Sequence, residues 1–404
     1  MTLKTKEFRP FIARLLALFF ILVIIFIPFA WDLQTQITHF LFEKPVSFIT
    51  HQFFQQSINY IDFSSDTIGL NLLICLLFFI SFCVTLLLSF FSNKSTLIII
   101  TSRLLITYFL AFVLIKYGID KVFKAQFYLP EPNILYSNFG NLSKDILFWS
   151  TIGTSRFYNI TIGCIEILIG LLLIVSKTRT IGLLFTILSF LNILIINLGF
   201  DISVKTFTML LILMAIFTVY PNLKQIWIFL THQKNASLSV IEVHFFKSKK
   251  LELAIKILTT CFLLGSIFLP YYQTNNYNDD EQKRPFLHGA YEITQMIVNN
   301  DTLKPIDFTY KKIFIHRKSF LIFQKKNDEM EDFYLKIDSS KRQIELFDYN
   351  KKATIIDYRY TETDSVLTLK LRTNQLNLIT AKALDWRKLP ALKNEFHFNI
   401  DQIH

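Results

Sequence analysis

The sequence is poor in the residues that form disulfide frameworks. Only four cysteines occur among its 404 residues, and all of them lie inside long apolar runs: Cys75, Cys83, Cys164 and Cys261. We therefore predict no disulfide framework. The segment after residue 271 has no cysteine at all, so its fold does not depend on the redox state of its compartment.

Residue patterns for common redox and metal centres are also missing. None of the eight histidines lies inside an apolar run, which excludes a haem ligated by histidines from membrane helices. The sequence has no Cys-x-x-Cys, His-Glu-x-x-His or P-loop pattern. We predict no metal site, no cofactor and no catalytic residue, and we lean against an enzymatic activity.

What the sequence has in excess is apolar residues, which make up 52% of the chain and are concentrated before residue 272. A helix needs about 20 apolar residues to cross a hydrocarbon core of about 30 Å. The runs that meet this length predict about seven transmembrane helices, at 11–30, 68–91, 97–118, 148–175, 181–200, 203–220 and 253–271. The first run lacks a small-residue cleavage site at its end, so we expect an uncleaved anchor.

The net charge of +11 is explained by basic residues at the ends of these runs, so we predict no nucleic-acid partner. With the N-terminus in the cytoplasm, the counted lysines and arginines fall mainly on the inner side. The inner ones are Lys4, Lys6, Arg9, Arg14, Lys94, Lys177, Arg179, Lys224, Lys234, Lys247, Lys249 and Lys250, and the outer ones are Lys44, Lys121, Lys124 and Lys144. Seven spans then place the C-terminal domain outside.

Beyond Pro270 the pattern changes to short segments with alternating apolar residues, separated by polar turns. The predicted strands are Tyr291–Val298, Phe308–Ile315, Phe320–Gln324, Phe333–Ile337, Gln343–Phe347, Thr354–Arg359, Val366–Leu371 and Leu376–Thr380. Short strands at this spacing predict an antiparallel all-β barrel. We expect residues 273–404 to form this domain and to fold alone.

The chain is thus predicted to contain four parts. Residues 1–96 form a region of two transmembrane helices with an amphipathic loop on the outer leaflet, and residues 97–221 form a bundle of four. Residues 222–272 hold a basic cytoplasmic linker and the seventh helix, and residues 273–404 hold the β domain.

Two charged residues lie inside predicted spans, and such residues are usually functional or paired. Arg103 and Glu166 fall at nearly the same depth from the inner face, so an ion pair between them is one interpretation. In the other, Arg103 extends to the inner headgroups and Glu166 is protonated. Gly163 and Gly170 share the face of Glu166 and predict close contact with another helix.

A second polar cluster is predicted at the outer ends of the middle helices. It consists of Asp120, Lys121, Arg156, Asn197, Asp201 and Lys205. One interpretation is a set of ordinary interfacial salt bridges. The other is a mouth that binds a small polar or anionic headgroup.

The middle helices resemble the DoxX-like membrane family over residues 99–221. The matching pieces are Tyr117-Gly118-Ile119-Asp120-Lys121-Val122-Phe123, Gly163-Cys164-Ile165-Glu166-Ile167-Leu168-Ile169-Gly170-Leu171-Leu172-Leu173 and Lys177-Thr178-Arg179. The resemblance implies a four-helix bundle in a bacterial inner membrane. The family includes a quinone-linked oxidoreductase subunit, but its usual His-Gly is Tyr117-Gly118 here.

The C-terminal domain is similar to the lipocalin-like β domain of larger DoxX-like proteins. The similar stretch runs from Phe286-Leu287-His288-Gly289-Ala290-Tyr291-Glu292-Ile293 to Phe396-His397-Phe398-Asn399-Ile400.

Three functions remain open at this point. The first is a non-catalytic multi-pass membrane subunit that binds a ligand, or a membrane or extracytoplasmic protein partner, through the β domain. The second is a quinone-linked oxidoreductase subunit, for which quinone would be the cofactor. The third is a small-molecule permease, ranked last because the spans from residue 97 onward contain no interior proline.

Overall fold

The structure, a computed structural model, describes residues 3–54, 61–91, 95–232, 248–371 and 377–393. The chain folds into two compact units. The helical unit comprises Met1–Phe123 and Ile160–Tyr277, and the barrel unit comprises Lys124–Asn159 and Asn278–His404. These units divide the chain at other points than the four predicted parts, because residues 124–159 fold with the strands instead of the helices. Residues 233–247 of the predicted linker and the end of the lipocalin-like stretch lie outside the described residues.

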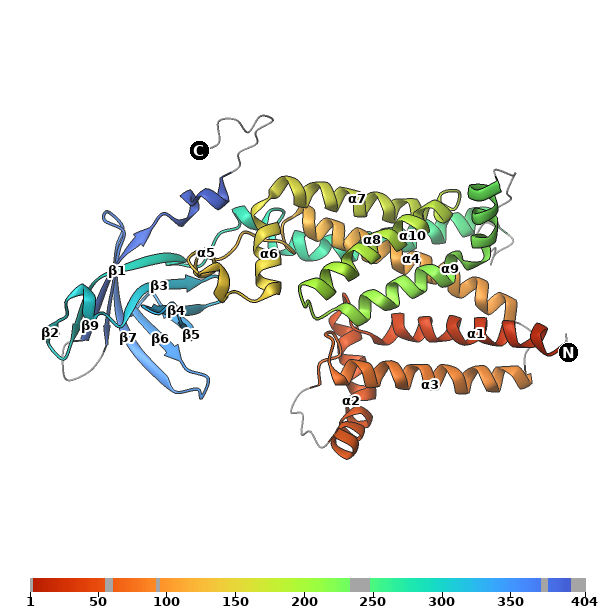
Figure 1. Cartoon of the computed structure of the whole chain (residues 1–404), viewed down its shortest axis with the longest axis horizontal. Coiled ribbons are helices and arrows are strands. Elements are labelled where there is room, and N and C mark those ends of the chain that lie inside the picture. The colour runs from red at the N-terminus through yellow and green to blue at the C-terminus, as the bar shows by residue number, and fades with distance from the viewer. Residues whose placement is uncertain (1–2, 55–60, 92–94, 233–247, 372–376, 394–404) are drawn as a thin grey trace. The chain divides into compact units, whose positions relative to one another are not determined.

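The helical unit contains a helix at each predicted span (Figure 1). These helices are α1 (Leu3–Phe26), α3 (Ile68–Phe91), α4 (Ser95–Val122), α7 (Arg156–Ile174), α8 (Arg179–Gly199), α9 (Lys205–His232) and α10 (Lys249–Thr274). Among the described residues, 6 helices are long and apolar enough to cross a membrane, and the apolar part of α1, Pro10–Phe26, is shorter. The predicted loop after the first span contains α2 (Asp32–Phe54). The protein is therefore a multi-pass integral membrane protein.

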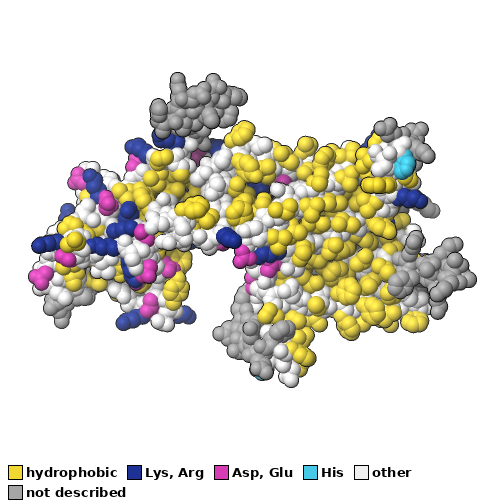
Figure 2. All heavy atoms as spheres, in the orientation of Figure 1, with side chains coloured by type: hydrophobic (Ala, Val, Ile, Leu, Met, Phe, Trp, Pro, Cys, Tyr) yellow, Lys and Arg dark blue, Asp and Glu magenta, His cyan; other side chains and the backbone are white. Residues whose placement is uncertain are grey.

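Helix α4 forms the core of the helical unit. It packs against α1, α9 and α10, and its residues from Phe109 to Ile115 are all buried. A helix that is apolar on every face is stable only when other helices surround it or when it contacts lipid. The outer faces of the surrounding helices also carry hydrophobic side chains, as Figure 2 shows for the visible side, and this surface suits the hydrocarbon core of a bilayer.

The fourth predicted span, 148–175, is wrong as a single helix. The structure breaks it into α6 (Lys144–Thr154) and α7, with Ser155 in an extended conformation between them. The side-chain amide of Asn159 donates hydrogen bonds to the carbonyl oxygens of Ile152 and Ser155, both at 2.8 Å. In a continuous helix the N–H of Arg156 would bond the Ile152 carbonyl, so the Asn159 side chain takes the place of that bond and stabilises the break.

The barrel unit contains a closed antiparallel barrel, as predicted. Its nine-stranded sheet has the order β2-β1-β3-β4-β5-β6-β7-β8-β9 and closes by pairing β1 with β9, so eight strands form the ring and short β2 lies beside it. The strands are β1 (Gly289–Val298), β2 (Asp301–Thr302), β3 (Tyr310–His316), β4 (Phe320–Lys325), β5 (Met330–Asp338), β6 (Gln343–Phe347), β7 (Ala353–Thr361), β8 (Val366–Leu371) and β9 (Asn377–Leu384).

The barrel interior is filled by its own side chains. Alternate residues along the strands point inward, and Ile313, Leu321, Ile344 and Leu367 have no accessible surface. A buried side chain with no accessible surface borders no cavity large enough for water. The centre of this barrel is therefore a packed core.

The segment between α4 and α7 packs on the outer wall of the barrel. It contains α5 (Pro132–Leu135) and α6, and Leu129, Leu135 and Tyr136 contact a small apolar cluster around Phe314 and Trp386. Short 3-10 helices occur at Phe139–Asn141, Asp279–Glu281, Pro305–Asp307, Trp386–Lys388 and Pro390–Leu392.

Candidate functional site

A buried ion pair lies between α4 and α7 in the helical unit. The Lys121 ammonium donates to the Glu166 carboxylate at 2.7 Å, and the two side chains are only 7% and 4% exposed. An unpaired charge at such a place is costly, so each residue stabilises the charged form of the other. Both residues were predicted to be important, but they were not predicted to pair with each other.

Glycines make this pair geometrically possible. A Cβ atom on Gly118 would lie 2.5 Å from the carbonyl oxygen of Gly163, and one on Gly163 would lie 2.6 Å from that of Gly118. A Cβ on Gly170 would meet Ile115 at 2.6 Å. The predicted close face of α7 is thus confirmed, and α4 is the helix that it contacts.

The same end of α4 carries a second set of polar contacts. The Asp120 carboxylate accepts hydrogen bonds from the Lys116 ammonium at 2.9 Å and from the Tyr271 hydroxyl of α10 at 2.6 Å. Lys121 also lies over the ring of Tyr117, 5.3 Å from its centroid. The last turns of α4 therefore connect α7 and α10 through charged and polar groups.

The predicted pair of Arg103 and Glu166 is not formed. The guanidinium of Arg103 lies over the ring of Phe217, 5.0 Å from its centroid, whereas Glu166 binds Lys121. The glycine contacts set an antiparallel register, with Gly163 against Gly118 and Gly170 against Ile115. Glu166 therefore lies level with residues beyond Ile115, which is itself 12 residues from Arg103, or about 18 Å along the helix. The prediction assumed that the inner ends of α4 and α7 are level, but α4 has 28 residues and α7 only 19.

The predicted outer-face cluster is not a single site, because its members have different partners. Asn197 donates to the Thr208 hydroxyl at 3.0 Å, and Lys205 pairs with Asp201 at 2.7 Å. Arg156 belongs to the barrel unit and pairs with Glu281 at 3.4 Å. These contacts agree better with ordinary salt bridges than with a common mouth.

Asp66 caps the N-terminus of α9, and the sequence analysis did not predict this role. Its carboxylate accepts hydrogen bonds from the backbone N–H groups of Lys205 at 2.8 Å and Thr206 at 2.9 Å. A carboxylate at a helix N-terminus accepts hydrogen bonds from free N–H groups and interacts favourably with the positive end of the helix dipole. No local pattern could have revealed this contact, because 139 residues separate Asp66 from Lys205.

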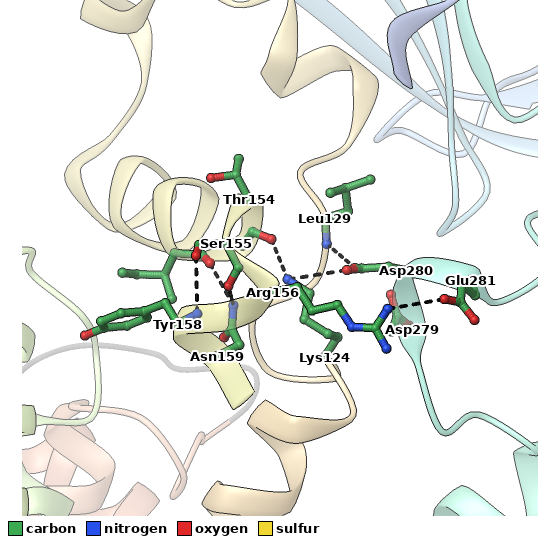
Figure 3. Close-up of polar contacts among 12 residues, drawn as sticks. Lys124, Leu129, Thr154, Ser155, Arg156, Tyr158, Asn159, Asp279, Asp280 and Glu281 are labelled. Atoms are coloured by element: carbon green, nitrogen blue, oxygen red, sulfur yellow. Dashed lines mark hydrogen bonds and ion pairs between the residues drawn. The ribbon is translucent and has the colours of Figure 1, made fainter. Parts of the chain in front are cut away.

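A buried lysine lies within the barrel unit (Figure 3). Lys124 has no accessible surface, donates to the carbonyl oxygen of Gly153 and lies 3.5 Å from the Asp280 carboxylate. Asp280 also accepts a hydrogen bond from the backbone N–H of Leu129 at 2.9 Å. Burial lowers the pKa of Lys124 below its usual value, although Asp280 opposes the shift. These contacts attach the 124–159 segment to the chain just before the barrel.

A second buried cluster surrounds Glu131. Its carboxylate lies 2.8 Å from His288 Nε2, 3.3 Å from Arg317 Nε and 3.9 Å from His316 Nε2. Burial favours the neutral acid, but the bond to His288 and the nearby positive groups outweigh it and hold the pKa of Glu131 below its usual value. Burial likewise lowers the pKa of His316.

Arg317 links this cluster to further groups. It stacks 3.7 Å from the ring centroid of Tyr128 and binds the Asp279 carboxylate, which Arg284 also contacts at 3.1 Å. The sequence analysis missed all of these residues. No sequence pattern could reveal the contact between Glu131 and His288, because more than 150 positions separate them.

Two open pockets lie on the barrel unit. The junction pocket, of about 580 Å³, is lined by Leu129, Asp280, Glu281, Gln282, Lys283, Arg284, Arg387 and Leu392. The arginine–tyrosine pocket, of about 600 Å³, lies near the turns that join β5 to β6 and β7 to β8, and it contains Arg342, Tyr358, Arg359 and Tyr360. Both volumes fall in the range of about 300–1,000 Å³ that small-molecule sites occupy.

Comparison with known proteins gives one informative relative. A stretch of 114 residues, 28% of this chain, is 31% identical to the uncharacterized protein YwoB of Bacillus subtilis (strain 168) and covers 72% of that protein. The chain belongs to the YwoB family. Membership in the YwoB family assigns no activity, because the relative's name states none.

No protein-family model matches the chain, and no solved structure matches it. The DoxX-like and lipocalin-like resemblances therefore stay predictions for this member of the YwoB family.

Proposed function

We propose that this protein is a membrane-anchored binding protein whose barrel unit holds a ligand or a protein partner while the helical unit fixes it in the bilayer. The observation that carries the proposal is the contrast between the packed centre of the barrel and two open, charged pockets at the surface of the barrel unit. A packed interior supplies rigidity, and rigid barrels commonly present their binding groups on loops.

A binding role fits these pockets better than catalysis does. Neither pocket is lined by cysteine or histidine, and their carboxylates stand beside cations that pair with them or share the pocket. Nucleophilic catalysis needs a nucleophile with a base within hydrogen-bond reach. The groups present are instead those that orient a polar ligand.

The proposal includes a bacterial inner-membrane location with the barrel unit outside the cytoplasm. The excess of lysine and arginine in the predicted inner segments supports this orientation. The relation of YwoB to a bacterium supports a bacterial membrane.

A second candidate, a quinone-linked subunit, is favoured by a different observation. The pair of Lys121 and Glu166, with Asp120 and Tyr271 nearby, places protonatable groups among membrane helices. Such groups often mark proton-linked chemistry. The described pocket among these helices, bordered by Tyr108 and Phe112, is only about 10 Å³, which is too small for a quinone ring without rearrangement.

The two candidates can be separated with the full chain in lipid nanodiscs. Thermal-shift and calorimetric titrations would use oligosaccharides, small organic acids and peptides, and a parallel assay would follow reduction of a short-chain quinone. The binding proposal expects one ligand class to bind and the Lys283→Gln/Arg387→Gln or Arg342→Gln/Arg359→Gln variant to weaken it. Quinone turnover that Glu166→Gln abolishes, together with no ligand binding, would instead establish the second candidate.

A further inference from the structure

The arginine–tyrosine pocket has an unusual chemical lining for a membrane protein with so many apolar residues. No aliphatic side chain lines it. Its lining consists of aromatic rings, hydroxyls, two guanidiniums and one carboxylate, from Phe286, Tyr358, Tyr360, Ser339, Thr361, Thr363, Arg342, Arg359 and Glu362. A lipid chain or an aliphatic peptide side chain would find only aromatic partners there.

The aromatic rings form a cluster with one exposed face. The centroid of Phe286 lies 6.2 Å from that of Tyr358 and 6.3 Å from that of Tyr360, and the ring planes are inclined by 56° and 87°. Phe286 is 49% exposed although it contacts both tyrosines. Because the ring planes are inclined, a flat aromatic base cannot stack between two parallel rings here. The exposed ring of Phe286 still offers a surface on which a ligand can pack. The C–H face of a sugar ring packs well on such a surface.

Of the two arginines, Arg342 is placed to bind a ligand on these rings. Within the part of the chain that the structure describes, Arg342 has no ion pair and its side chain is exposed. It lies in the turn between β5 and β6 with a φ of 54°, and its carbonyl accepts a hydrogen bond from the Tyr358 N–H at 2.9 Å. This bond holds the turn that carries Arg342 next to the strand that carries the two tyrosines, whereas Arg359, between them on β7, points to the opposite face of that strand. A guanidinium binds a carboxylate through two parallel hydrogen bonds.

We propose that this pocket binds an acidic oligosaccharide, with a sugar ring on Phe286 and Tyr360 and its carboxylate on Arg342. Glu362 and the threonine hydroxyls accept hydrogen bonds from the sugar hydroxyls. The closed barrel has no free strand edge at which an extended peptide could add a strand. This inference rests on the proposed binding function and names its ligand class and its pocket.

The test uses the full chain in nanodiscs and isothermal titration with four probes of known structure. They are trigalacturonic acid, the neutral maltotriose, citrate as an anion without a sugar ring, and AMP as an aromatic anion. We expect trigalacturonic acid to bind more tightly than the other three. Arg342→Gln should weaken it about tenfold, as expected for loss of a charged hydrogen bond, and Phe286→Ala should weaken it as well.

Lys370→Gln is the matched control, because Lys370 is an exposed cation of the same unit that lines neither pocket. It should leave the affinity unchanged, and equal melting temperatures would show that all variants are folded. Equal or tighter binding of maltotriose, citrate or AMP would overturn the proposed ligand class. Binding that only Arg387→Gln or Lys283→Gln weakens would overturn this pocket and leave the binding function standing. No binding of trigalacturonic acid overturns the inference, whereas the proposed function fails only if every ligand class fails.

Discussion

At the scale of single residues, the charges of this protein are stabilised mainly by partners far away in the sequence. Lys121 and Glu166 are 45 positions apart, and Glu131 and His288 are 157 apart. A buried charge that loses its partner is left poorly solvated, whereas removal of both partners is much better tolerated. Each of these pairs can therefore be tested by removing one partner and then both.

For the pair in the helical unit, Glu166→Gln and Lys121→Gln should each lower the detergent-solubilised melting temperature. The loss for each could reach about 3–5 kcal/mol for a fully buried pair. The double variant should recover part of it, since no stranded charge remains. Arg103→Gln provides the control, because the effects of Arg103→Gln and Glu166→Gln should add within about 0.5 kcal/mol. Additive effects of Lys121→Gln and Glu166→Gln would show that the ion pair contributes no coupling.

The Glu131 cluster predicts a stability that falls in two steps as the pH is lowered. Because the pKa of His316 is lowered on folding, its contribution is complete above the usual histidine value of about 6.5 and is lost as the pH falls toward the folded value. The lowered pKa of Glu131 adds a further loss below about pH 4.5. His288, Arg317 and Lys318 are the other charged groups in this environment.

Thermal melts between pH 2 and 8 would resolve these steps. His316→Gln should flatten the step that begins below about pH 6.5 and leave the lower one. Glu131→Gln should remove the lower step and reduce the stability at neutral pH. Unchanged profiles in both variants would mean that neither group changes its pKa on folding.

At the scale of elements, two features determine how the chain is assembled. One is the close contact of α4 and α7 at Gly118 and Gly163, and the other is the packing of the 124–159 segment on the barrel. Neither helix propensity nor strand alternation encodes these features, because both depend on which surfaces meet.

Gly163→Ala should destabilise the helical unit by about 1–3 kcal/mol, since the added methyl would overlap the carbonyl oxygen of Gly118. Gly199→Ala is the control, because no atom lies within 4 Å of a Cβ at that position. Detergent melting curves would compare the two. A Gly163→Ala variant as stable as Gly199→Ala would show that α4 and α7 are not in close contact.

The barrel should be incomplete without residues 124–159, which revises the expectation that residues 273–404 fold alone. Without that segment, Phe314, Ile322 and Trp386 lose the cover of Leu129, Leu135 and Tyr136, and His288 and Arg317 lose Glu131. Residues 278–404 should therefore bind a hydrophobic dye and melt at a lower temperature than the same barrel fused to residues 124–159. Equal melting temperatures for the two proteins would show that the segment adds no stability.

At the scale of the whole molecule, the chain passes between the two units three times, near residues 123, 159 and 277. The barrel unit is thus connected to α4, α7 and α10. The predicted topology, with seven spans and an inner N-terminus, would place all three connections on the outer side of the membrane.

Topology reporters can test this orientation. Alkaline phosphatase fused after His404 should be active and a fluorescent protein should be dark there, because the barrel unit is predicted to lie outside. The same reporters fused after Lys177, in the predicted inner turn between α7 and α8, should give the opposite result. Phosphatase activity only at Lys177 would reverse the orientation of the protein.

The sequence by itself determined the elements of this protein. Long apolar runs can be stable only as helices in lipid or in a core, and the period-two alternation after Pro270 gave all eight barrel strands to within a few residues. The sequence also indicated that Glu166 lies on the same helix face as Gly163 and Gly170 and that this face contacts another helix, because side chains three or four positions apart share one face of a helix.

Only the tertiary structure decided how the charges pair and where the units divide. Glu166 binds Lys121 and not Arg103, because the glycine contacts fix a register that the lengths of the apolar runs do not reveal. The helix break at Ser155 and the packing of residues 124–159 on the barrel depend on side-chain amides and apolar surfaces that meet only after folding. Periodicity records the side of an element that is buried, but the surface that covers it is set by the packing of the whole chain.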